Sequence, residues 1–132
     1  MLVPKASRNL IKALLSTIES DKIMSDIQEI EVTIKELKEV VERKNAVNRL
    51  LGNRDFKKLI MEGYFKDEAA RLVGLLGEQA AAQYREEIIR SMDGIAQFKA
   101  HLRTVRQIGE AAASELAHHE QALEDLRNED QE

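Results

Sequence analysis

An uninterrupted apolar heptad in the second half of the chain limits the fold more than any other feature of the sequence. Between Ala81 and Leu126, fourteen positions follow one another in alternating steps of three and four. That spacing keeps one mostly apolar seam along a single α-helix, as in a coiled coil. Gly109 falls on the seam, where the lack of a side chain would let a neighbouring helix approach closely. The sequence therefore predicts one long helix over residues 78–127.

A shorter heptad in the first half predicts an antiparallel partner for this helix. Its apolar positions again alternate in steps of four and three, and they are Ile23, Ile27, Ile30, Ile34, Leu37 and Val41. Gly52 and Asn53 predict where this arm ends, because glycine stops helices and asparagine caps the next one. The apolar face of residues 10–18 does not run in phase into Ile23, so residues 7–51 are either two helices or one kinked helix.

The composition agrees with an all-α fold. Charged residues make up 33% of the 132 residues and there is a single proline, a profile that favours helices. We predict a long antiparallel helical hairpin, or coiled-coil-like bundle, with short helices at the turn and an N-terminal helix that closes the bundle. The predicted single domain 1–132 comprises a first arm 7–51, a turn 53–77, a second arm 78–127 and a frayed acidic tail 128–132.

The turn concentrates the aromatic residues of the chain. Three of the five lie within residues 53–76, where Gly63 is expected to end one short helix and Asp67 to cap a second. Tyr64 and Phe65 would then fill the corner between them. These rings either plug the closed end of the hairpin or meet a partner together with neighbouring lysines. The partner-binding candidates are Phe56, Lys57, Lys58, Tyr64, Phe65 and Lys66.

The residues N-R-D-F-K-K-L-I-M-E-G-Y-F-K-D-E-A-A-R-L, at positions 53–72, also resemble a segment of small helical proteins encoded among the structural genes of tailed bacteriophages. The resemblance is limited to about residues 53–76. It implies a virion component or an assembly factor, located in the cytoplasm of the host cell or associated with the virion. It carries over no catalytic residue.

Charge is segregated along the chain despite the small net value of −4. Residues 19–42 and 107–132 are acidic, whereas residues 43–71 and 85–106 are basic. In a hairpin this pattern predicts one negative and one positive end. A basic stripe at helical spacing on the second arm gives candidate phosphate-binding residues, which are Lys99, Arg103 and Arg106. The basic N-terminus is expected to pack on the bundle, with a membrane surface as the alternative.

No pattern in the sequence points to catalysis, a metal, a cofactor or a small-molecule substrate. There is no cysteine and no glycine-rich phosphate loop,. His118 and His119 are adjacent and cannot chelate as an i, i+4 pair would, so His119 is expected to be a polar or partly exposed seam residue. No apolar run reaches the roughly 20 residues that span a membrane, and we expect a soluble protein.

These patterns favour a non-enzymatic structural or assembly protein. By the resemblance it would belong to a tailed phage and act through helix–helix and charge-complementary contacts with itself or with another virion or assembly protein. One alternative is a nucleic-acid-associated, packaging-type factor that binds DNA through its basic end. Another is an acidic protein inhibitor that mimics nucleic acid.

Overall fold

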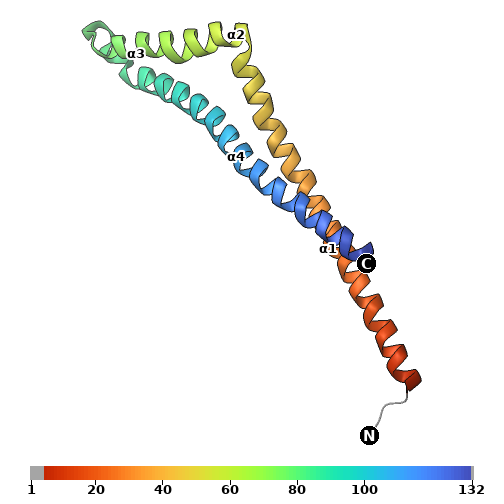
Figure 1. The fold of residues 1–132 in the computed structure, drawn as a ribbon. Helices are drawn as coiled ribbons and strands as arrows, with labels where there is room; N and C mark the ends of the chain where they lie inside the picture. The colour runs from red at the N-terminus through yellow and green to blue at the C-terminus, as the bar shows by residue number, and fades with distance from the viewer. Residues whose placement is uncertain (1–4, 132) are drawn as a thin grey trace. The chain divides into compact units, whose positions relative to one another are not determined.

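The computed structural model describes residues 5–131, and that part of the chain contains helices without strands (Figure 1). This confirms the all-α prediction. In chain order the elements are α1 (Lys5–Gly52), α2 (Arg54–Phe56), the π-helix η1 (Lys57–Glu68), α3 (Ala69–Leu76), the 3-10 helix η2 (Gln79–Tyr84) and α4 (Arg85–Gln131).

The first arm is one continuous helix rather than two. No proline or glycine interrupts it before Gly52, so the change of apolar phase near Ile23 alters the buried face without ending the helix. Its predicted end is confirmed at Gly52. Asn53 has an extended backbone, and its Oδ1 accepts a hydrogen bond from the Phe56 N–H at 2.9 Å.

The turn differs from the prediction in where the chain changes direction. Gly63 lies inside the π-helix η1, whose backbone leads directly into α3, so the expected break at Gly63 and the cap at Asp67 are both wrong. The helical stretch that begins with α2 ends at Gly77, as expected, and Glu78 is extended. Tyr64 and Phe65 consequently lie along a helix and not at a corner.

The second arm begins as the 3-10 helix η2 and becomes α-helical only at Arg85. The tighter turn covers residues that the sequence assigns to a single α-helix from residue 78. At the other end α4 continues to Gln131, so residues 128–131 of the predicted frayed tail are helical. Glu132 lies outside the described residues.

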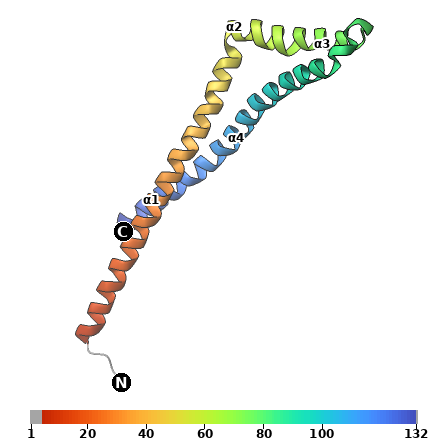
Figure 2. The ribbon, with the colours of Figure 1, turned by 180° about the vertical axis from the view of Figure 1, so that it is seen from behind.

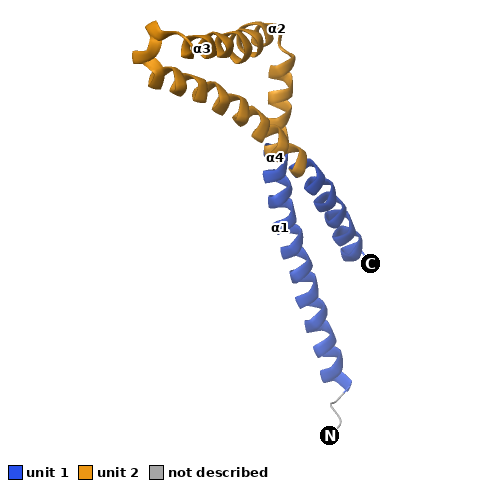
Figure 3. Ribbon diagram, turned by 90° about the vertical axis from the view of Figure 1, so that its left-hand side faces the viewer, with its two compact units in different colours: residues 1–39, 112–132 blue, residues 40–111 orange. Residues whose placement is uncertain are grey.

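The chain divides into two compact units, and each long helix contributes to both (Figure 3). Unit 1 consists of residues 1–39 and 112–132, and unit 2 of residues 40–111. The hairpin pairing of the long helices is described below within each unit. Across residues 5–131, no helix is long and apolar enough to cross a membrane.

In unit 1, α1 and α4 run antiparallel and bury the predicted seams against each other (Figure 3). Ile34, Ala112 and Leu123 are buried, and the Arg127 guanidinium donates a hydrogen bond to Glu31 at 2.9 Å. The first part of α1 extends beyond the end of α4, and residues 5–22 are all exposed. The prediction that an N-terminal helix closes the bundle is therefore wrong, because the pairing register carries α1 past its partner.

In unit 2, the stretch from α2 to α3 leads away from the end of α1, and the chain then reverses so that the start of α4 lies beside α3 (Figures 1 and 2). The core between them contains Leu72, Ile88 and Ile95. In the same unit, where α4 passes α1, a Cβ added to Gly109 would overlap the Cβ and Cγ atoms of Lys44. The predicted close approach of a helix at Gly109 is thus confirmed.

Candidate interaction surfaces

The aromatic residues of the turn belong to the core of unit 2. Tyr64 and Phe65 are half-buried and pack against the cluster of Leu72, Ile88 and Ile95. The Phe65 ring meets Phe98 of α4 edge-on, with 5.3 Å between the ring centroids. The rings therefore join η1 to α4, which agrees with a role in closing the fold.

The wider turn of the π-helix explains which residues of η1 face inward. Phe56, Ile60, Phe65 and Ala69 are separated by steps of four, five and four, and all are half-buried. A π-helix bonds residue i to i+5, and its longer turn aligns residues four to five apart. Leu59, which α-helical spacing places on the same face as Phe56, is instead 65% exposed.

Leu59 is thereby exposed on η1, directly after two exposed lysines in the sequence. Lys57, Lys58 and Lys66 are all exposed, and Leu59 follows the first two directly. We call these four residues the η1 lysine surface. Sequence reasoning proposed the lysines but missed Leu59, because only the non-α turn brings it outward.

The basic stripe on α4 is exposed and is connected to the turn. The Lys99 Nζ atom lies 5.9 Å from the centroid of the Phe65 ring, within the range of a cation–π contact. Arg103 and Arg106 are exposed. Neither forms an ion pair or a side-chain hydrogen bond among residues 5–131. The structure thus places one member of the stripe beside a residue of the other candidate set, a juxtaposition that the sequence does not reveal.

Other basic residues of unit 2 are occupied by neighbouring carboxylates. The Arg71 guanidinium lies 2.5 Å from Glu68, and its hydrogen bond lowers the pKa of that carboxyl. Arg49, 2.8 Å from Glu42, lowers the pKa of Glu42 in the same way. These exposed pairs contribute little to stability. Arg49 and Arg71 are thus paired with carboxylates, whereas Arg103 and Arg106 of the α4 stripe form no ion pair among residues 5–131.

The two units carry opposite net charge. Residues 1–39 and 112–132 contain seven basic and fourteen acidic residues, a net of −7. Residues 40–111 contain thirteen basic and ten acidic residues, a net of +3. Each unit therefore offers a distinct electrostatic surface to a partner.

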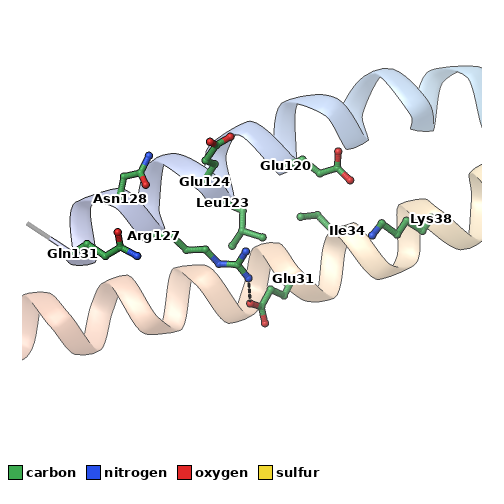
Figure 4. Close-up of a pocket in the computed structure, with 9 residues that line it drawn as sticks. All are labelled: Glu31, Ile34, Lys38, Glu120, Leu123, Glu124, Arg127, Asn128 and Gln131. Atoms are coloured by element: carbon green, nitrogen blue, oxygen red, sulfur yellow. Dashed lines mark hydrogen bonds and ion pairs between the residues drawn. The ribbon is translucent and has the colours of Figure 1, made fainter.

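A shallow groove lies between α1 and α4 in unit 1, and charged and polar side chains form most of its lining (Figure 4). Ile34 and Leu123 point toward each other across it, and the pair between Arg127 and Glu31 bridges the helices. The other residues that line it are Lys38, Glu120, Glu124, Asn128 and Gln131. Within residues 5–131 no cluster of three or more potential metal ligands occurs.

His119 lies half-buried on the seam of unit 1. Its Nδ1 atom is 2.8 Å from the backbone oxygen of Glu115. Because a carbonyl oxygen only accepts, Nδ1 is the donor. The ring therefore forms a hydrogen bond within its own helix. Its half-buried position confirms the prediction of a partly exposed seam residue.

The first part of α1 presents the longest row of uncovered apolar side chains in the described chain. This N-terminal row consists of Leu10, Ile11, Leu14, Leu15 and Ile18, and each side chain is 49–62% exposed. Single exposed apolar residues are ordinary, but a contiguous row is typical of an interaction surface.

Comparisons of the chain with protein-family models, with curated proteins and with solved structures found no match.

Proposed function

We propose that this chain is a non-enzymatic assembly protein that works through helix–helix and charge-complementary contacts with other proteins. The observation that carries the proposal is the amount of apolar helix surface left uncovered. The N-terminal row and Leu59 are exposed on continuous helical stretches, a form suited to docking against another helix.

The resemblance of residues 53–72 to small proteins of tailed phages supports a virion or assembly partner. Along η1, the exposed Leu59 offers an apolar anchor, and the exposed Lys57, Lys58 and Lys66 offer positive charge. Such a combination fits an acidic patch on a protein, because apolar burial supplies affinity and charge supplies orientation.

The test is capture of partner proteins by the immobilised full-length chain from phage-infected cells and from purified particles. We expect a defined virion or assembly protein to be retained by the wild-type chain. A variant with Lys58→Glu and Leu59→Glu should lose it, whereas Ile108→Ser, which alters another exposed apolar residue, should retain it. Equal retention of every captured protein by both variants would exclude the η1 lysine surface, and no retained protein at all would exclude the proposal.

DNA binding is the second candidate, and one observation favours it. Arg103 and Arg106 form no ion pair among residues 5–131 and lie in the unit with net charge +3. With Lys99 they lie at i, i+4 and i+7 on α4, and such a stripe can follow phosphates. A packaging-type factor would use this surface.

A salt titration of binding to duplex DNA separates the two candidates. DNA binding predicts an affinity that falls steeply as salt rises and that is lost in Lys99→Ala, Arg103→Ala, Arg106→Ala. A protein-directed assembly factor predicts no such loss. An inhibitor that mimics nucleic acid would instead compete with DNA through residues 107–132 and would be indifferent to the triple substitution.

A further inference from the structure

The N-terminal row has the spacing of a coiled-coil seam. Within it, Ile11, Leu15 and Ile18 follow at steps of four and three, as core positions do. Their side chains are 49%, 53% and 62% exposed, whereas the seam residues of the same helix from Ile23 to Val41 are half-buried or buried. Leu10 and Leu14 border this seam.

The row lies on a different face of α1 from the seam that α4 covers. The step from Ile18 to Ile23 is five residues, which breaks the alternation of three and four and turns the apolar face around the helix. The hairpin seam therefore cannot simply continue onto the row.

Charge along one edge of the row indicates which helix fits. Lys5, Lys12, Glu19 and Asp26 are spaced seven apart, so they line the same edge of α1. The first two are basic and the last two are acidic. In an antiparallel pair this edge of one helix faces the same edge of the other, so the basic half of one copy meets the acidic half of the second copy. In a parallel pair the edge would face the opposite edge of the second copy, and these charges would not meet.

We propose that the N-terminal row binds a second copy of this chain, forming an antiparallel pair of α1 helices about a two-fold axis. This inference rests on the proposed assembly function and names one partner for it. In the pair, Lys12 lies opposite Glu19 of the second copy, and Lys5 lies opposite Asp26 of the second copy. The apolar seams of the two copies face each other between these charges.

The area and symmetry suit a reversible dimer. Covering the five side chains of the row on both copies removes on the order of 1,000 Å² of surface, where specific interfaces begin. A two-fold interface uses the same patch on both subunits, and the row with its charged edge is self-complementary in that sense. The pairing uses no residue of the η1 lysine surface.

Sedimentation equilibrium of the full chain over a wide concentration range tests the dimer. We expect a monomer–dimer equilibrium whose dissociation constant rises at least about tenfold in Ile11→Ser, Ile18→Ser, because apolar burial is lost. The matched control Ile108→Ser changes an isoleucine of similar exposure, 54%, on α4 and should dimerise as the wild type does. A monomer at all concentrations, or equal weakening by the control, would overturn the proposal.

Charge reversal tests the direction of the pair without altering its apolar seam. Lys12→Glu should weaken dimerisation by about fivefold, because the new carboxylate would then face Glu19 of the second copy. Adding Glu19→Lys to the same chain should restore the wild-type constant, because the complementary charges return in exchanged places. A parallel dimer predicts no restoration, and that result would overturn the antiparallel arrangement.

A membrane surface is the competing occupant of a basic amphipathic helix. Co-sedimentation with anionic phospholipid vesicles provides this arm of the test. Binding to vesicles by a chain that remains monomeric in buffer, and loss of that binding in Ile11→Ser, Ile18→Ser, would refute the self-association.

The outcomes also separate this inference from the assembly function. A monomeric chain that still captures a virion protein overturns the dimer alone. A chain that dimerises through the row but captures no protein overturns the proposed function alone.

Discussion

Among single residues, Asn53 acts where the chain turns from α1 into α2, and Gly109 acts where two helices meet. Asn53 satisfies the N–H of Phe56 at a helix start that follows directly on the end of α1. Gly109 leaves room for the Lys44 side chain. Asn53 acts through its side-chain oxygen, and Gly109 acts through its lack of a Cβ atom. A single substitution with a matched control can therefore test each role.

Replacing Asn53 by alanine should lower the free energy of unfolding by about 1 kcal/mol, because the Phe56 N–H loses its acceptor at the helix start. Asn53→Asp keeps an oxygen at the same position and should lose little of this stability. Urea denaturation followed by circular dichroism measures both. Equal loss in the two variants would show that the cap hydrogen bond is not the cause.

Gly109→Ala should destabilise the protein by about 1–3 kcal/mol although alanine favours helices, because the new Cβ forces the Lys44 side chain and its helix away. Gly94, on the same helix, has open space around its Cα. Gly94→Ala should therefore stabilise the protein by up to about 1 kcal/mol. Opposite signs in denaturation experiments are expected, and two stabilised variants would contradict the close approach.

At the scale of elements, η1 determines which side of the turn is core and which is surface. Steps of four and five between its apolar residues do not follow one face of an α-helix, which turns every 3.6 residues. In a π-helix they do, and the side chains of Phe65 and Ala69 consequently pack against the cluster of Leu72, Ile88 and Ile95. The same turn places Leu59 outside.

The π-turn predicts opposite effects for two neighbouring apolar residues. Phe65→Ala should lower the free energy of unfolding by about 2 kcal/mol, since its ring fills space between η1 and α4. Leu59→Ala should change it by no more than about 0.5 kcal/mol, because the side chain is mostly exposed. Urea denaturation of the two variants decides. A large loss in Leu59→Ala would favour an ordinary α-helix here.

At the scale of the whole molecule, a net charge of −4 conceals two units of opposite sign. Of the acidic residues in the stretches 19–42 and 107–132, all but Glu42 and Glu110 fall in unit 1, whereas the basic stretches 43–71 and 85–106 fall wholly in unit 2. Such a chain can interact with both anionic and cationic surfaces.

This charge separation predicts retention at pH 7 on both a heparin column and an anion exchanger. Lys99→Ala, Arg103→Ala, Arg106→Ala should elute from heparin at clearly lower salt, because the exposed stripe is removed. The control Lys22→Ala, Lys35→Ala, Lys38→Ala removes the same charge from unit 1 and should elute from heparin nearly as the wild type does. Equal shifts for both triple variants would mean that heparin responds only to net charge.

The candidate surfaces were partly visible in the sequence. The lysines of the turn and the stripe on α4 follow from composition and spacing, and the structure leaves them exposed. Three features could not be predicted from the sequence. They are the inward position of Phe65, its contact with Lys99 and the exposure of Leu59. All three depend on a π-helical turn, which propensity arguments do not anticipate because such turns are rare.

Four features could be predicted from the sequence alone: the helical class, the two seams, the helix end at Gly52 with its cap at Asn53, and the close approach at Gly109. These features depend on local periodicity and on the backbone chemistry of individual residues. Three further features emerge only from the folded chain: the first arm is one helix, the turn is π-helical, and α1 continues beyond α4 and leaves the N-terminal row uncovered. The physical reason is that register and packing across helices depend on contacts between residues far apart in the chain, which a repeating local pattern permits in more than one way.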